Sequence, residues 1–174
     1  MTNIYTTRGT VDFMEKVKEK YPDEKMILMN GSGTSLLLHE TEGKTVFQTP
    51  HKYEVIAELG QLQDRGFFAM NNVPVSDEGK PVFEDRFKKD YGKMADAAGF
   101  TAYRLLRPIG SDTYVILTEW EDAKAFDMWR HTPAFKDAYD TSTMDAHAGP
   151  AVHIFTSAPY LSLYSSVSDE EDGL

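Results

Sequence analysis

The chain has 174 residues, of which 41% are hydrophobic and 12% aromatic, which is enough for a packed core in one large domain or two small ones. Lys and Arg total 18 against 28 Asp and Glu, and the net charge of -10 disfavours nucleic acid as a partner. The chain has no cysteine, which excludes disulfides, thiolate catalysis and cysteine-ligated metals. Five methionines are expected to fill the core: Met14, Met26, Met29, Met70 and Met94.

The N-terminal part, residues 1–65, is predicted to form a β-α-β-β extension. NIYTTRG reads as a strand, VDFMEKVKEKY as a helix, and KMILMN and SLLLHETEG as two strands joined by the turn GSGT. HKYEVIAELG also suits a helix by composition, but its apolar residues alternate, so we predict a further strand.

The C-terminal part, residues 66–167, is predicted to be a ferredoxin-like domain of the α+β class. A strand at 67–75 is followed by a helix from Pro81, two strands around the turn IGSD, a helix capped by Asp122, a second turn of helix from Pro133, and a last strand in VHIFTSAPYLSLYSS. Residues 168–174 form an acidic tail that we expect to be disordered, and we assign it no function.

Two side chains are candidates for a binding site. Asn71 shares the predicted strand face of Phe67, Ala69 and Val73, and an amide on an apolar face must find a hydrogen-bond partner, either the neighbouring backbone or a ligand. Asn72 points the other way. Trp129 forms an i, i+3 pair with Phe126 on one side of its helix, which by itself is typical of a core tryptophan.

The run VILTEWEDAKAFDMWRHTPAFKDAY, with AGFTAYRLLRP before it, resembles the antibiotic-biosynthesis-monooxygenase (ABM) superfamily and, within it, the IsdG-type heme-degrading monooxygenases. TSLLLHETEGKTVFQTPHKYEVIAELG and the overall length are similar to the N-terminally extended HmoB and TRAP-like members. The resemblance implies a ferredoxin-like α+β barrel. It also implies that the extension packs as the second half of a pseudo-dimer, which gives a monomer, with a homodimer as the alternative.

In that family an asparagine, a tryptophan and a histidine surround the heme. The resemblance assigns the first role to Asn71, with Asn72 as the alternative, and the second to Trp129. The family histidine, which binds iron, lies ten residues after the tryptophan, where this chain has Tyr139. Three alternatives stay open: the Tyr139 phenolate binds iron, His147 replaces it as iron ligand, or no heme binds and Tyr139 packs in the core. Phe126 and Arg104, the latter facing a heme propionate, are further candidate contacts.

The resemblance therefore implies a heme-degrading monooxygenase that uses heme as substrate and cofactor, O2 and an external reductant, and that releases iron. A reductase or other electron donor would be its partner. The alternatives are a heme-binding protein without turnover and a TRAP-like stress or signalling protein that has lost the site. No signal-peptide pattern and no apolar run near about 18 residues occurs, so we expect a cytoplasmic protein without a membrane partner.

Overall fold

The computed structural model describes residues 1–31, 33–139 and 154–167. The N-terminal part follows the predicted order, and the ambiguous segment HKYEVIAELG forms a strand. Its elements are β1 (Asn3–Gly9), α1 (Val11–Lys20), β2 (Lys25–Gly31), β3 (Thr34–Thr41) and β4 (His51–Leu59). Thr10 caps α1, since its hydroxyl accepts a hydrogen bond from the Phe13 N–H at 3.3 Å.

The C-terminal part has the predicted ferredoxin-like order of helices and strands. Its elements are β5 (Phe67–Pro74), α2 (Lys80–Asp90), the 3-10 helix η1 (Tyr91–Asp96), β6 (Phe100–Ile109), β7 (Thr113–Trp120), α3 (Ala123–Arg130), α4 (Pro133–Tyr139) and β8 (Tyr160–Ser166). The predicted cap is confirmed, because Asp122 Oδ1 accepts from the Ala125 N–H at 2.8 Å. The last strand begins only after Pro159, and Phe155 makes an isolated bridge to Val75.

The eight strands close into a barrel in the order β1-β3-β2-β8-β5-β7-β6-β4. Each half of the chain contributes four adjacent strands with the same internal order, β4-β1-β3-β2 and β8-β5-β7-β6. The β4–β6 junction runs from Lys52 to Leu59, whereas in the described residues the β2–β8 junction pairs Met29 and Asn30 with two serines. At that shorter junction Gly31 packs directly on β8, where an added Cβ would lie 2.1 Å from the Leu163 carbonyl oxygen.

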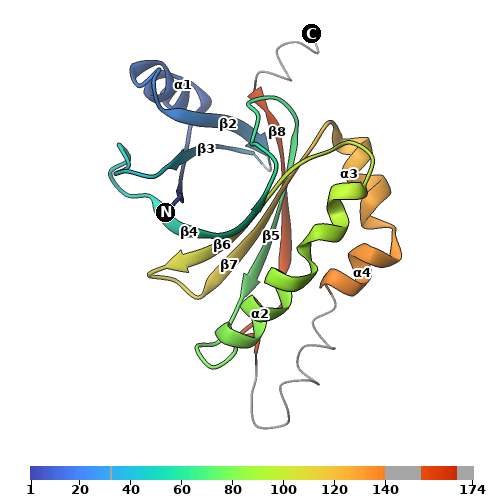
Figure 1. Ribbon diagram of the computed structural model, residues 1–174. Coiled ribbons are helices and arrows are strands. Elements are labelled where there is room, and N and C mark those ends of the chain that lie inside the picture. The colour runs from blue at the N-terminus through green and yellow to red at the C-terminus, as the bar shows by residue number, and fades with distance from the viewer. Residues whose placement is uncertain (32, 140–153, 168–174) are drawn as a thin grey trace.

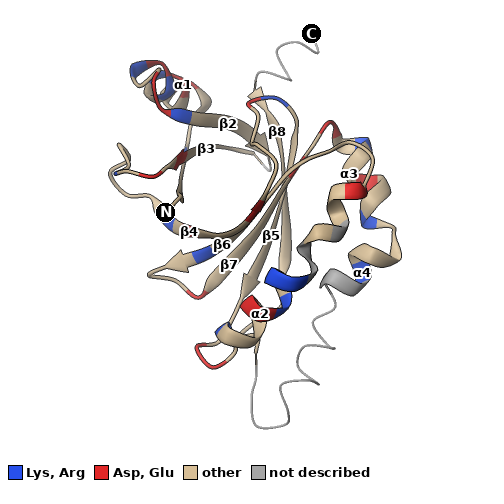
Figure 2. Cartoon of the chain, in the orientation of Figure 1, with Lys and Arg blue, Asp and Glu red and all other residues tan. Residues whose placement is uncertain are grey.

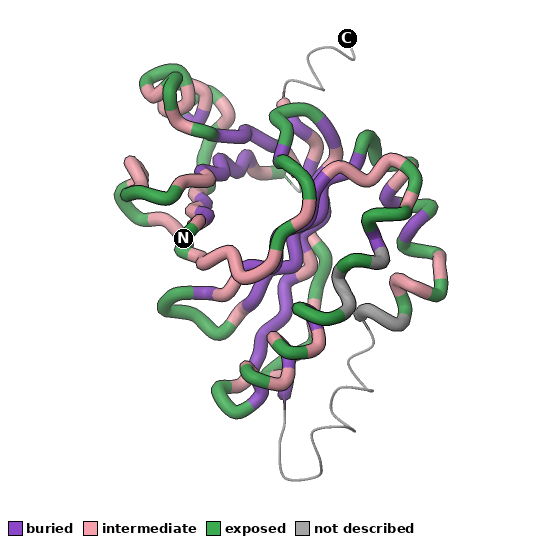
Figure 3. The backbone as a smooth tube through the Cα atoms, in the orientation of Figure 1, coloured by how far each residue is buried: buried purple, intermediate pink, exposed green. Residues whose placement is uncertain are grey.

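Apolar side chains form three separate clusters. Alternate strand residues such as Ile27, Leu38 and Leu117 fill the barrel interior. The outer face of β5, β6 and β7 is covered by α2, α3 and α4, which lie together on one side of the barrel in Figure 1. A smaller cluster lies under α1 on the other half. In Figure 3, buried residues (purple) lie mainly along the strands, and exposed residues (green) are more frequent on the helices and loops. The five methionines predicted to fill the core are all buried: Met14, Met26, Met29, Met70 and Met94.

No helix in these described segments is long and apolar enough to span a membrane.

Glu119 is a fully buried carboxyl group inside the barrel. It pairs in register with Phe68, an interior residue, and its Oε1 accepts a hydrogen bond from the Gln63 N–H at 2.7 Å. Its Oε2 has no hydrogen-bond partner among the described residues. Burial disfavours the charged form and raises the pKa of Glu119 to about 8, although the Gln63 hydrogen bond opposes that rise.

We expect the Glu119→Gln variant to lose a pH dependence of folding that the wild type shows. Between the ordinary carboxyl pKa of 4.5 and about 8, the folded protein keeps a proton on Glu119 that the unfolded chain releases. The free energy of unfolding should therefore fall by up to about 1.4 kcal/mol per pH unit as pH rises through this window. Urea unfolding of both proteins at pH 5.5 and 7.5 measures the difference. Equal losses in wild type and variant would contradict the assignment.

Candidate functional site

The two neighbouring asparagines of β5 lie on opposite faces of the barrel wall. Ala69 and Val73 belong to the cluster under the helices, while Phe68 and Met70 belong to the barrel interior. By the same alternation Asn71 faces the helices and Asn72 faces inward, as the sequence predicted.

Asn72 is buried and held by several hydrogen bonds. Its Nδ2 lies 3.1 Å from the Met70 carbonyl oxygen, 3.2 Å from the Tyr160 carbonyl oxygen and 3.1 Å from the Ser162 hydroxyl. These partners tie β5 to the start of β8. Asn72 therefore has a structural role and is removed as an alternative to Asn71.

Asn71 is half-buried, and its side chain makes no hydrogen bond within the segments that the structure describes. It pairs in register with Ile116 of β7 and Leu161 of β8. Ile116 is buried, whereas Leu161 is 36% exposed. Asn71 thus presents an amide from an apolar sheet face, next to a partly accessible leucine, and this amide can bind solvent or a ligand.

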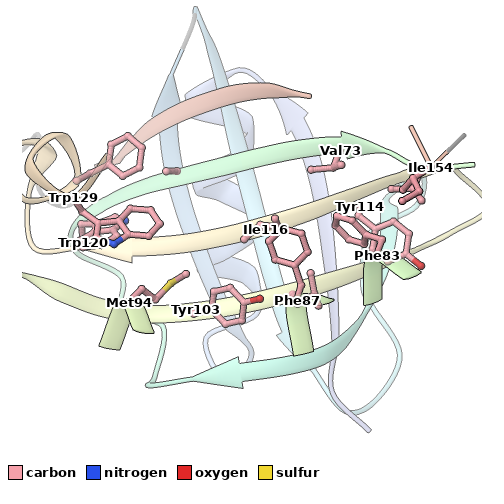
Figure 4. Packing of buried hydrophobic residues seen from close by; sticks show 14 residues of the cluster. Val73, Phe83, Phe87, Met94, Tyr103, Tyr114, Ile116, Trp120, Trp129 and Ile154 are labelled. Carbon is pink, nitrogen blue, oxygen red and sulfur yellow. The ribbon is translucent and has the colours of Figure 1, made fainter. Parts of the chain in front are cut away.

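Trp129 lies at one end of the same face, in a group of aromatic rings. Its ring centroid is 5.2 Å from that of Trp120 and 5.0 Å from that of Phe135, which meets it edge-on at 86°. Phe126 packs on Phe67 and Trp120. Trp129 is only 6% exposed, so its indole has a fixed position in the helical layer (Figure 4).

The other end of the face carries a polar cluster that sequence reasoning missed. Tyr114 lies beside Phe83 near this end in Figure 4, and its hydroxyl donates to Glu84 of α2. Arg107 of β6 donates to Glu84 through Nη2 at 2.5 Å and to Glu54 of β4 at 3.2 Å. Burial raises the pKa of Glu84, but the hydrogen bonds from Arg107 and Tyr114 outweigh it, and the net pKa lies below the ordinary value. The cluster anchors α2 to the barrel.

Arg104 lies on the wrong face for the predicted propionate contact. Its side chain is 2% exposed and points into the barrel, where Nε bonds Glu40 at 2.9 Å and Nη1 bonds the carbonyl oxygens of Leu59 and Gly60 at 3.1 and 2.9 Å. Because Asn71 and Trp129 lie on the outer face, the barrel wall separates Arg104 from them. The prediction that Arg104 belongs to the same site is therefore wrong.

The two candidate iron ligands fall outside the described side chains. Tyr139 is the last residue of α4, but its side chain is not described, and His147 lies in residues 140–153. Phe126 is described: it is buried, and its ring packs on those of Phe67 and Trp120. In the described residues no group of three or more His, Asp or Glu side chains could hold a metal ion.

The chain is similar to a protein family and to curated proteins of Staphylococcus aureus. Residues 66–141 match the family described as antibiotic biosynthesis monooxygenase. The chain is 29% identical over 149 residues to "Signal transduction protein TRAP" of Staphylococcus aureus, covering 86% of this chain and 89% of that protein.

Solved structures extend the comparison to the whole barrel. One is described as a major regulator of staphylococcal pathogenesis. It matches with a TM-score of 0.86 and 26% identity, over 96% of this chain and 100% of its own. LmHde, a heme-degrading enzyme from Listeria monocytogenes, has a TM-score of 0.71 over 94% of this chain and 98% of its own; at 16% identity it bears on the fold alone. These matches bear out the similarity to the ABM superfamily and to its TRAP-like members.

The neighbouring asparagines should differ sharply in their effect on stability. Asn72→Ala removes the hydrogen bonds between β5 and β8 and leaves buried polar groups unpaired, so we expect a loss of about 1–3 kcal/mol in the free energy of unfolding. Asn71→Ala removes no such bond and should change stability by less than about 0.5 kcal/mol. Urea unfolding of both variants measures the contrast, and a larger loss for Asn71→Ala would refute this division of roles.

Proposed function

We propose that the protein binds heme on the helix-covered face of β5 and degrades it, releasing iron; residues 66–141 match the family described as antibiotic biosynthesis monooxygenase. The observation that carries the proposal is the Asn71 amide, which presents a hydrogen-bonding group from an apolar face without a partner among the described residues. Small-ligand sites combine this kind of apolar wall with a few placed polar groups.

The described residues around Asn71 form an apolar wall. Ala69 and Val73 flank Asn71 along β5, and Ile116 lies beside it on β7. Leu161, its partner on β8, keeps 36% of its surface exposed, so the wall is accessible from that edge. Ala69, Val73 and Ile116 are already buried, so a porphyrin would bury the accessible surface of Asn71 and Leu161 at this edge and bring a polar iron ligand within reach of the Asn71 amide.

Trp129 would supply a rigid boundary for the ligand. Trp120 and Phe135 hold its indole from two sides, at ring distances of 5.2 and 5.0 Å, so it cannot turn away without disrupting the core. A side chain held in this way can press on a bound macrocycle. We assign the distorting role to Trp129 and the orienting role to Asn71.

The iron ligand is either Tyr139 or His147. A phenolate at Tyr139 requires its pKa to be lowered from about 10, for which a nearby cation is needed. Lys136 lies three residues earlier on α4 and is exposed. With heme bound, O2 and electrons from an external reductant, supplied by an electron-donor protein, would provide the ring-opening chemistry.

A regulatory protein without turnover is the second candidate function. Trp129 is only 6% exposed and packs on Trp120 and Phe135, so the core accounts for it without a ligand. The staphylococcal relatives are named as signal transduction proteins. In this case the fold persists and the face around Asn71 serves another purpose.

Titration of the purified protein with hemin tests these functions. We expect a saturable one-to-one Soret shift, lost or altered in either His147→Ala or Tyr139→Phe, which would identify the iron ligand. With ascorbate and O2, loss of the Soret band should be roughly 100-fold slower in Asn71→Ala, because one positioned hydrogen-bond donor is removed. Asn72→Ala, whose side chain faces the barrel interior, is the matched control and should leave both readouts unchanged under conditions where it is folded.

The outcomes separate the candidates. Absence of a saturable Soret shift would reject heme binding and favour the regulatory function. Saturable binding without ring opening would leave a heme-binding protein without turnover. Ring opening that is insensitive to Asn71→Ala would reject the role given to this residue.

We also propose that the protein is a monomer, in which the two halves of one chain pack together as the two subunits of a dimer would. Two sets of four strands with the same order close one barrel, which pairs both edges of each set within the chain. Light scattering at micromolar concentration should give a mass near 19.7 kDa. A mass near twice that value would support the alternative, an ordinary homodimer.

A further inference from the structure

One end of the barrel interior opens into a pocket that has no part in the proposed heme site. The pocket has a volume of about 220 Å³ and lies where β1, β5 and β6 end and where β4, β7 and β8 begin. By share of liquid volume this space corresponds to roughly seven water molecules, which is enough for a small organic molecule. The barrel wall separates the pocket from the outer face that carries Asn71 and Trp129.

Arg8 is a cation that faces this pocket. Strand alternation on β1 places Ile4, Thr6 and Arg8 on the inner face, and the first two are buried. Arg8 pairs in register with Leu36, and its Nη2 donates a hydrogen bond to the Tyr164 hydroxyl at 3.3 Å. Leu36 and Tyr164 both belong to the cluster inside the barrel, whereas Arg8 itself is exposed. The guanidinium therefore lies at the mouth of the interior.

The base of the pocket is apolar. It is formed by four buried residues of the interior cluster: Leu36, Met70, Leu106 and Val115. These side chains offer no strong hydrogen-bond donor, so an inorganic anion at this depth would leave its oxygens unpaired. A ligand that fills the base must present an apolar group to it. Met70 favours an aromatic ring, because a thioether makes favourable contacts with the edges of such rings.

Tyr53 adds a hydrogen-bond donor near Arg8. It is half-buried against the interior cluster, and its hydroxyl makes no hydrogen bond within the segments that the structure describes. Burial raises the pKa of Tyr53, and the nearby Arg8 charge only partly opposes that rise, so the phenol is neutral at pH 7 and keeps its proton. Tyr160 and His51, both exposed, also line the pocket, which is therefore open to solvent at this end.

Arg8 has no acidic partner among the residues that the structure describes: it forms no salt bridge with them, and no Asp or Glu lines the pocket. Two acidic residues of the interior, Glu40 and Glu119, lie toward the other end. Glu119 is roughly 20 Å from Thr113 by the rise per residue along β7. Figure 2 shows that most strand residues are neither acidic nor basic. The Arg8 guanidinium is thus available to an anion from solution.

We propose that this pocket binds a small monocarboxylate with an aromatic body, of the benzoate class. The carboxylate lies at the mouth, where Arg8 can donate two parallel hydrogen bonds to it and the Tyr53 hydroxyl one more. The ring lies on the apolar base, against Met70, Leu106 and Val115. The site is independent of the proposed function, since it uses the inner face of the barrel and not the outer face.

NMR titration of the full chain with benzoate, benzyl alcohol and inorganic phosphate tests the proposal, with the Met70 methyl signal as the reporter of the pocket. We expect a saturable shift with benzoate, at least about ten-fold weaker binding of the neutral alcohol, and no saturable shift with phosphate. Arg8→Gln should weaken benzoate binding about ten-fold and change benzyl alcohol binding less than about two-fold. Tyr53→Phe, which keeps the ring, should weaken benzoate binding about three-fold.

Lys52→Gln is the matched control for the loss of one positive charge at this end of the barrel. Lys52 lies between His51 and Tyr53 on β4, is exposed and does not line the pocket. Solvent screens its charge from a bound carboxylate, so we expect a change in benzoate affinity of less than about two-fold. Urea unfolding confirms that each variant is folded, and Arg8→Gln should fold normally because Arg8 is exposed.

The proposal is overturned if benzoate gives no saturable shift, if wild type and Arg8→Gln bind benzoate equally, or if benzyl alcohol or phosphate binds as tightly as benzoate. Loss of benzoate binding in Asn71→Ala would place the ligand on the outer face of the barrel and would also overturn it. Benzoate binding that persists while hemin gives no Soret shift would support this pocket and reject the heme site separately.

Discussion

Closure of the barrel within one chain is the constraint on which the rest of this structure depends. Once all eight strands are paired in a ring, every strand residue lies either in the barrel interior or on the outer wall. A one-residue shift of β5 would exchange the environments of Asn71 and Asn72, so the register that closes the ring also decides which amide can meet a ligand. The candidate site is a consequence of this register together with the helices above it.

The two halves have the same strand order but different outer layers. The C-terminal half places α2, α3 and α4 over its wall, and their aromatic side chains form a dense cluster around Trp120. The N-terminal half has α1 and a loop, with Met14 at the centre of a much smaller cluster. The cover, and not the strand order, therefore distinguishes the wall of the site proposed for heme from the wall under α1.

Local chemistry made much of the fold predictable. The alternation around Asn71, the Asp122 cap and the burial of the methionines depend on near neighbours in sequence, and each prediction is confirmed. The location of Arg104 depends on long-range register, because a strand arginine faces inward or outward only after the ring has closed. The cluster of Glu84, Arg107 and Tyr114 joins α2 to β6 and β7. It depends on how the helix packs against the sheet, so spacing along the chain could not reveal it.

The junction between β2 and β8 is the least extensively paired boundary between the halves, because the described residues pair there only at Met29 and Asn30. The β4–β6 boundary, in contrast, is paired along most of β4. Thermal opening would therefore begin at β2–β8 and leave the halves attached through β4 and β6. The freed edges could pair with those of a second opened molecule, so the same fold offers a route to strand-exchanged dimers, and close packing at Gly31 opposes it.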